Sequence, residues 1–185
     1  MALPAELRET AASIELLVLD VDGVLTDGTL WYGAEGEVLK AFHVRDGLGI
    51  KLARQQGVEV AVISGKTGAP LKRRLDVLGV ERAHLGCEDK GAALDALLAD
   101  VGCDAARAAH VGDDLIDLPV FERVGLPIAV ADAHPLAREA ARWVTERAGG
   151  RGAVREVTDA LVEARGDLRE AFERYLSARR AEGEP

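Results

Sequence analysis

The sequence has little cysteine, no long apolar run and no leader-like N-terminus. Its two cysteines, Cys87 and Cys103, form neither a disulfide framework nor a metal-ligand spacing, so we expect both to be small reduced side chains. No apolar run approaches the roughly 20 residues that a membrane span needs. The N-terminal segment lacks a basic stretch followed by an apolar one, which argues against a secretion signal. We therefore expect a cytoplasmic protein without a membrane partner.

Basic residues are also scarce relative to acidic ones. The chain carries 23 Lys and Arg against 32 Asp and Glu, a formal net charge of −9. This balance argues against nucleic acid as a partner, because phosphate backbones require basic surfaces. An anionic small molecule would need a local cluster of Lys, Arg or a metal ion to overcome the overall negative field.

Short apolar runs alternate with longer helical patterns along the chain. Strands are expected at 16–19, 58–63, 82–85, 106–111, 126–130 and 142–144, and helices near 47–56, 69–78, 90–101, 116–124 and 135–141. Fully apolar strands separated by helices predict an α/β fold with a doubly wound, Rossmann-like and mostly parallel sheet. Ligands should bind at the carboxyl ends of its strands. We expect residues 1–185 to form a single domain with a core at about 14–165.

Two segments depart from the alternation. Residues 29–32 and 38–44 have a β-like pattern and flank the turn sequence GAEG, which predicts a β-hairpin inserted at about 28–44. It carries Trp31, Tyr32 and Phe42, which pack either on their own domain or against another subunit. Residues 153–180 have a charged helical pattern, and the tail at about 166–185 should fray from residue 183.

The strongest chemical signal is DVDGVLTD at residues 20–27, directly after the first apolar run. Charged residues at the end of a buried strand cost free energy unless something compensates them. A divalent cation would do so, and oxygen ligands without Cys or His suit Mg²⁺ rather than zinc. Gly23 allows a sharp turn, so that one carboxylate can attack while the other reaches the leaving group.

Three further candidate motifs follow in the chain. AAHVGDD at 108–114 is another strand that ends in acids, Asp113 and Asp114, with Asp117 three residues on. Ser64 ends the second strand, where a hydroxyl and loop amides can hold phosphate oxygens. Lys90 lies at the start of a predicted helix, where a positive charge is unfavourable because it opposes the helix dipole. A lysine at this unfavourable position suggests a functional role.

These four motifs, in this order, resemble those of the haloacid dehalogenase superfamily of phosphohydrolases. The resemblance implies that Asp20 is the nucleophile, Asp22 the general acid/base, Ser64 the phosphate-binding hydroxyl and Lys90 the lysine that steadies nucleophile and phosphoryl group. It implies that Asp113 binds Mg²⁺ together with the Asp20 carboxylate and the Asp22 backbone carbonyl, and that Asp114 and Asp117 support the site. The chemistry does not need His43, His110 or His134, which we interpret as structural.

A narrower resemblance concerns the substrate. Neither superfamily insertion site has room for a cap domain, and DVDGVLTDGT, AFHVRDG, VGDDLID, VADAHP and GGRGAVRE resemble the capless 3-deoxy-D-manno-octulosonate 8-phosphate phosphatases. That family serves lipopolysaccharide synthesis and is tetrameric, with neighbouring subunits helping to close each site. Arg45, Lys66, Arg151 and Thr26 are the candidate substrate-binding residues. The family often has Arg where this chain has Lys66. Lysine keeps the positive charge of arginine but cannot form its bidentate hydrogen bonds.

Two alternatives remain. A nine-carbon ulosonic acid 9-phosphate would suit the same fold, although the enzymes for it favour an acidic residue at position 66 and in the GG-x-G turn, where this chain has Lys66 and Arg151. A phosphorylatable signalling receiver also uses an Asp, Mg²⁺ and a Lys, but it has no need of a second acid at Asp22. A protein that kept the fold but lost catalysis is disfavoured, because all four motifs are intact.

Overall fold

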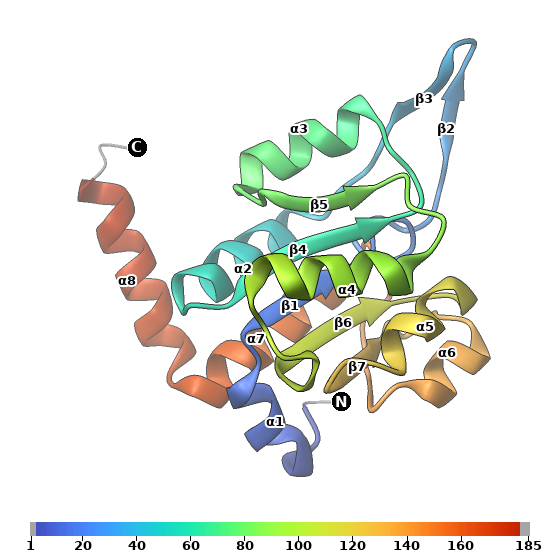
Figure 1. The fold of residues 1–185 in the computed structure, drawn as a ribbon. Coiled ribbons are helices and arrows are strands. Elements are labelled where there is room, and N and C mark those ends of the chain that lie inside the picture. The colour runs from blue at the N-terminus through green and yellow to red at the C-terminus, as the bar shows by residue number, and fades with distance from the viewer. Residues whose placement is uncertain (1–2, 182–185) are drawn as a thin grey trace.

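A six-stranded parallel sheet forms the centre of the molecule (Figure 1). The computed structural model describes residues 3–181. In chain order the strands are β1 (Leu16–Leu19), β4 (Glu59–Ser64), β5 (Arg82–Leu85), β6 (Ala108–Gly112), β7 (Leu126–Ala129) and β8 (Trp143–Val144). Their order across the sheet is β5-β4-β1-β6-β7-β8. The chain thus starts in the middle, winds to one edge and returns to the other side, which confirms the predicted doubly wound α/β fold.

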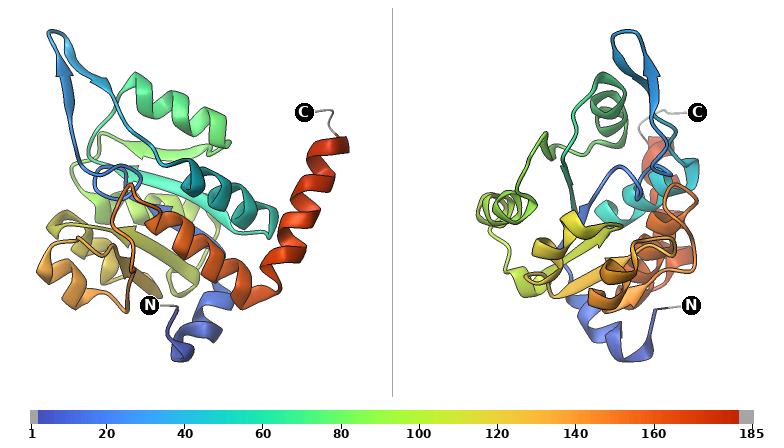
Figure 2. Two further views of the ribbon diagram at one scale, coloured as in Figure 1. Left: turned by 180° about the vertical axis from the view of Figure 1, so that it is seen from behind. Right: turned by 90° about the vertical axis from the view of Figure 1, so that its right-hand side faces the viewer.

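Helices cover both faces of this sheet. They are α1 (Arg8–Ser13), α2 (Val44–Gln55), α3 (Ala69–Leu78), α4 (Lys90–Val101), α5 (Leu118–Phe121), α6 (Pro135–Ala140), α7 (Ala153–Arg165) and α8 (Leu168–Ala181). Helices α4 and α5 lie in front of the sheet in Figure 1, and α2 and α7 lie in front of it in the reverse view of Figure 2. Because successive side chains of a strand point to opposite faces, Leu17 and Leu19 pack toward α2 and α7, whereas Leu16 and Val18 pack toward α4. This two-sided burial explains why β1 is apolar throughout.

Several predicted boundaries differ from the structure. The predicted strand at 38–44 ends at Leu39, and Val44 already begins α2. The predicted helix at 116–124 is a 3₁₀ turn, Leu115–Asp117, followed by the short α5. The helical pattern at 153–180 is two helices, since the chain is extended at Gly166 (φ 177°). Helix α1 was not predicted, and its Ala11 joins the buried cluster N-terminal to the expected start at residue 14.

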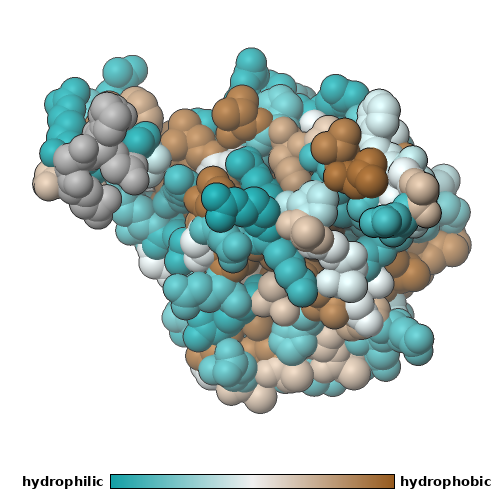
Figure 3. All heavy atoms as spheres, turned by 90° about the horizontal axis from the view of Figure 1, so that it is seen from above, coloured by the Kyte–Doolittle hydropathy of each residue, from teal (hydrophilic) through white to brown (hydrophobic). Residues whose placement is uncertain are grey.

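The inserted hairpin consists of β2 (Trp31–Gly33) and β3 (Gly36–Leu39), and it projects away from the sheet (Figures 1 and 2). Its apolar side chains are largely exposed: Trp31 by 52%, Tyr32 by 67% and Leu39 by 61%. Seen from above, the molecule shows brown apolar atoms among teal polar ones (Figure 3). Phe42 instead packs against the core. The chain therefore buries only some of the aromatic side chains of the hairpin segment.

The remaining expectations concern the chain termini and the membrane. Helix α8 extends beside α2 and α7 at one end of the molecule (Figure 1). The predicted fraying from residue 183 lies outside the described residues. Among the described residues, no helix combines the length and apolar character required to cross a membrane.

Candidate active site

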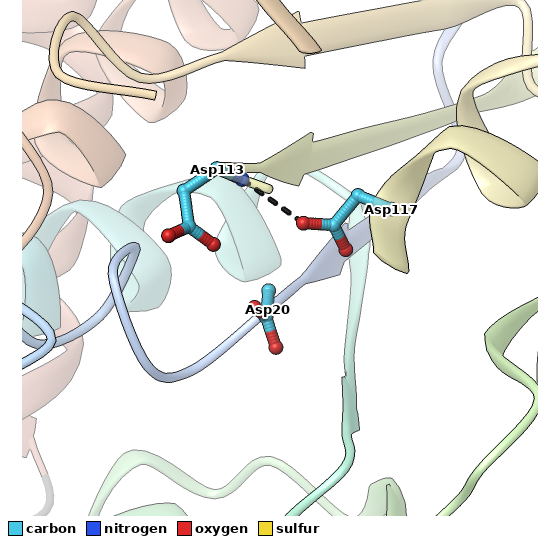
Figure 4. Close-up of side chains that lie close together, drawn as sticks. All are labelled: Asp20, Asp113 and Asp117. Carbon is cyan, nitrogen blue, oxygen red and sulfur yellow. Dashed lines mark hydrogen bonds between the residues drawn. The ribbon is translucent and has the colours of Figure 1, made fainter. Parts of the chain in front are cut away.

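Three carboxylates converge where β1 and β6 end (Figure 4). Asp20 directly follows β1, and Asp113 directly follows β6, the strand that pairs with β1. An oxygen from each of Asp20, Asp113 and Asp117 lies within 4.8 Å of the others. The parallel pairing of β1 with β6 therefore brings together two acidic motifs that are about 90 residues apart in the chain, at the point where the strand order reverses.

Asp117 acts as the hub of a buried hydrogen-bond network. One of its oxygens accepts from the Lys90 ammonium at 2.7 Å and is 2.9 Å from His110 Nε2. The other accepts from the backbone N–H groups of Asp113 and Asp114 at 2.9 and 3.3 Å. With both oxygens engaged, Asp117 fixes its neighbours rather than offering a ligand position. His110 also meets Phe121 edge-on and is fully buried.

Lys90 links this hub to the predicted nucleophile. Its ammonium lies 3.0 Å from Asp20 Oδ1, and the Lys90 and Asp20 side chains are 2% and 5% exposed. Burial alone would lower the pKa of Lys90, but the charges of Asp20 and Asp117 outweigh it and raise that pKa. Lys90 therefore stays protonated and supplies a fixed positive charge beside Asp20.

Burial and neighbouring charges raise the pKa of two of the three carboxylates and lower that of the third. Burial raises the pKa of Asp20, and the Asp117 charge adds to the effect, while Lys90 opposes it. Burial together with the charges of Asp20 and Asp117 raises the pKa of Asp113 to about 8. Burial opposes ionisation of Asp117 too, but the hydrogen bond from His110 and the charges of His110 and Lys90 hold its pKa below the ordinary range. The site thus contains more negative charge than its lysine can neutralise.

A divalent cation fits this imbalance. The Asp113 carboxylate accepts no hydrogen bond from any described residue, and Asp20 uses only Oδ1 for Lys90. Both are hard oxygen donors. Asp20 and Asp113 are therefore the side chains that would hold the metal. The exposed Asp114 caps the Leu115–Asp117 turn, and the supporting roles of Asp114 and Asp117 stay predictions.

Glycine residues allow the loops around the site to approach closely. Gly23 has φ +91°, and a Cβ there would lie 2.0 Å from Asp113 Oδ2. A Cβ on Gly149 would lie 1.6 Å from the Gly23 carbonyl oxygen. The Gly149 N–H donates to Asp132, which ties the glycine-rich turn to the loop after β7. Only glycine permits this packing of three loops.

The second predicted acid, Asp22, has an unforeseen partner. The Lys40 ammonium at the end of the hairpin hydrogen-bonds to Asp22 Oδ1 and lies 2.8 Å from Glu37 Oε1. Burial lowers the pKa of Lys40, but the hydrogen bonds to Asp22 and Glu37 outweigh it, so the pKa is raised. No sequence pattern pointed to this contact, because Lys40 lies outside the motifs and 18 residues from Asp22.

The predicted phosphate-binding segment follows β4, the other neighbour of β1. Ser64 is buried, and its Oγ accepts from the Lys66 N–H at 3.2 Å. The Lys66 ammonium has no hydrogen bond or ion pair with the described residues. Thr26, by contrast, is 1% exposed, donates to the Val21 carbonyl and accepts from the Gly28 N–H. The Thr26 hydroxyl therefore holds the loop, and a role of Thr26 in substrate binding stays a prediction.

The two predicted arginines lie in different places. Arg151 reaches back to Asp27 at 2.9 Å with a side chain that is 68% exposed, so it sits beside the acidic loop. Arg45 lines a groove of about 770 Å³ along α7, with Trp143 and Glu156. No contact among the described residues joins Arg45 to the carboxylate cluster.

Comparison with known proteins now decides the family. A profile of haloacid dehalogenase-like hydrolases matches residues 87–157. The 3-deoxy-D-manno-octulosonate 8-phosphate phosphatase of Escherichia coli strain K12 is 50% identical over 167 residues, which cover 90% of this chain and 89% of the relative. The chain belongs to the 3-deoxy-D-manno-octulosonate 8-phosphate phosphatase family. The predicted resemblance is confirmed.

Solved structures of this phosphatase family share the fold. The cobalt-bound enzyme from Haemophilus influenzae superposes with a TM-score of 0.86 at 41% identity, covering 89% of this chain and 99% of that one. The enzyme from Moraxella catarrhalis, in complex with magnesium, phosphate and a KDO molecule, gives 0.85 at 35% identity, with coverages of 94% and 97%. Family membership disfavours the signalling-receiver alternative. The carboxylates of Asp20, Asp113 and Asp117 form a group with the spacing to hold a metal ion.

Proposed function

We propose that this protein hydrolyses 3-deoxy-D-manno-octulosonate 8-phosphate to the free sugar acid and phosphate, with Mg²⁺ as the metal and an aspartyl-phosphate intermediate. The observation that carries the proposal is the Asp20–Lys90–Asp113 arrangement. The buried Asp20 carboxylate contacts the Lys90 ammonium at 3.0 Å and has an oxygen within 4.8 Å of an Asp113 oxygen. Family membership supplies the substrate class.

The residues suit an in-line phosphoryl transfer. Asp20 attacks phosphorus through a carboxylate oxygen, while Lys90 neutralises charge on the transferring group. Asp22 gives a proton to the leaving sugar oxygen and then takes one from the water that attacks the aspartyl-phosphate. Asp20 and Asp113, with the Asp22 backbone carbonyl, would hold Mg²⁺, which neutralises phosphoryl charge when bound. Hard oxygen donors favour Mg²⁺, although a relative also binds cobalt.

Substrate recognition rests on basic groups around the site. Ser64 and the loop amides that follow it are placed after β4 to hold phosphate oxygens. Lys66, with an unengaged ammonium, and Arg151, beside Asp27, are proposed readers of the sugar acid's carboxylate. Arg45 is proposed to contribute through its surface position on α2, in its own or a neighbouring site.

The assembly is proposed to be a homotetramer whose neighbouring subunits complete each active site. The exposed apolar residues of the hairpin support this, because a contiguous apolar surface on a small protein usually marks an interface. Residues 1–185 are proposed to form one phosphatase domain that acts in the cytoplasm, in lipopolysaccharide synthesis.

The alternative substrate is a nine-carbon ulosonic acid 9-phosphate. Lys66 and Arg151 argue against it, since the enzymes of that type favour acidic residues at these places. Steady-state kinetics of the wild-type protein with Mg²⁺ on both substrates test the choice. A higher kcat/KM for the eight-carbon substrate is expected, and a clear preference for the nine-carbon one would overturn the substrate but leave the phosphatase class.

A further inference from the structure

Lys40 has a charged and buried side chain for which the proposed mechanism has no role. It follows β3 in a hairpin whose side chains are mostly exposed, yet its own side chain is 1% exposed. It contacts two carboxylates, Asp22 in the acidic loop and Glu37 in β3. A lysine that only solvated the hairpin would extend into water instead.

The two contacts have different consequences. Burying an ammonium costs free energy unless carboxylates compensate it, and Glu37, three residues before Lys40, does so from within the hairpin. The bond to Asp22 crosses from the hairpin to the loop that carries the nucleophile. Lys40 holds one oxygen of Asp22, and the Asp22 side chain is still 22% exposed.

We propose that Lys40 is a positioning residue for the phosphatase reaction, which fixes the Asp22 carboxylate so that its second oxygen faces the leaving group. The inference rests on the proposed role of Asp22 as general acid and base. Lys40 keeps its three protons throughout. The proton given to the sugar oxygen comes from Asp22 and is returned to Asp22 from the attacking water.

This role gives the hairpin a function within its own chain. The relatives with a cap domain close their sites with a separate element, whereas here the inserted hairpin directly orients the acid. Alignment of Asp22 therefore depends on the hairpin's position, and any partner that packs on the hairpin also affects the acid.

The test uses the leaving group. A sugar alkoxide needs a proton from the acid, whereas 4-nitrophenolate departs without one. Lys40→Met should lower kcat/KM for the sugar phosphate by about 10- to 100-fold, less than the roughly 10²- to 10⁴-fold that general acid–base catalysis supplies, because Asp22 itself is retained. With 4-nitrophenyl phosphate the loss should stay under about 3-fold. Lys40→Arg should recover most of the activity on the sugar, and Lys51→Met, the same change on α2, should alter neither rate.

A double-mutant cycle shows whether Lys40 acts through Asp22. Asp22→Asn alone and Asp22→Asn with Lys40→Met should agree within about 2-fold on the sugar phosphate, because residues that act as a unit are non-additive. If the fold-losses of the two single variants multiplied in the double variant, the proposal would be overturned. Equal losses of kcat/KM on both substrates for Lys40→Met would overturn it as well.

A structural failure is separable from a positioning effect. Circular dichroism and thermal melts check the fold of each variant. Should Lys40→Met not fold, Glu37→Gln retains the lysine but loosens it, and it should lower only the rate on the sugar, by about 3- to 10-fold. An unchanged rate for that variant contradicts the proposal. The wild-type rate on the sugar phosphate tests the proposed function by itself, whereas the ratio between substrates in the variants tests Lys40.

Discussion

At Asp113, burial and two neighbouring carboxylates raise the pKa from its ordinary 3.8 to about 8. The folded protein therefore holds this proton more tightly than the unfolded chain does. Its contribution to stability is present at low pH, below the ordinary value, and is lost as the pH rises toward about 8. A bound cation would replace the proton as the neutralising charge, so pH and metal should act on the same group.

We expect added Mg²⁺ to raise the melting temperature more at pH 8 than at pH 5, because at pH 5 Asp113 is already neutralised by a proton. Asp113→Asn should remove most of this difference and abolish activity at low metal concentration. Asp95→Asn, a neutralising change on the exposed side of α4, should leave it intact. Scanning calorimetry with and without EDTA measures the shift, and equal Mg²⁺ stabilisation of the Asp113→Asn protein would count against the site.

Asp20→Asn should abolish turnover while preserving the fold. An amide cannot form the acyl-phosphate, and loss of a nucleophile costs at least about 10³-fold in kcat. The substitution also removes one negative charge from a buried cluster, so the melting temperature should not fall. Phosphate release and acid-quench trapping of phosphoprotein measure the outcome, and near-normal activity with Mg²⁺ would refute the covalent mechanism.

The residues that could be predicted are those whose position at a strand end is itself a signal. Asp20, Asp113 and Ser64 each follow a buried strand, and parallel pairing brings their strands together. Lys40 could not be predicted, because its contact depends on how the hairpin folds back over 18 residues. The loop contacts of Thr26 could not be predicted either, because a hydroxyl in a motif does not reveal whether backbone groups already engage it.

At the scale of elements, the loops after β1, after β7 and before α7 are packed by backbone rather than side chains. The Gly149 N–H donates to Asp132, and the Gly150 N–H donates to the Val24 carbonyl. The glycine-rich turn thus packs against the acidic loop and holds it through backbone contacts. The sequence GGRG is explained by this close backbone packing.

Gly149→Ala should therefore destabilise the protein by about 1–3 kcal/mol and lower kcat. The new Cβ would lie 1.6 Å from the Gly23 carbonyl oxygen, so the acidic loop must move. Gly166→Ala is the matched control, because its Cβ meets nothing within 4 Å and its backbone is extended. Urea unfolding and steady-state kinetics on both variants provide the comparison, and an equally small effect at the two glycines would remove the bracing role.

The accuracy of the element predictions follows the strength of the local pattern. Helices at 69–78 and 90–101 were placed to the residue, since each ends at a glycine with positive φ, Gly79 and Gly102. The strand expected at 38–44 was too long because β-like residues continue past the point where the chain leaves the hairpin for α2. Helix α1 has no strong periodicity, and its burial comes from α7, far along the chain.

At the scale of the whole molecule, the chain leaves an apolar hairpin uncovered while its catalytic groups are buried. Leu30, Trp31, Tyr32, Val38 and Leu39 are each more than 40% exposed. A closed ring of four copies would cover such hairpins by symmetry and bring a second chain over each site. Water exclusion, which capped relatives achieve with a mobile domain, would then come from assembly.

Trp31→Glu should give a smaller species with poor activity on the sugar phosphate, because a charge in a desolvated interface opposes association. Activity on 4-nitrophenyl phosphate should fall less, since Asp20, Lys90 and Asp113 belong to one chain. Leu136→Glu introduces the same charge at a side chain of similar exposure, 51%, on α6, and it should leave both size and activity unchanged. Light scattering and kinetics on the same samples measure the two properties together. A monomeric Trp31→Glu protein that keeps its kcat/KM for the sugar phosphate would show that each chain closes its own site.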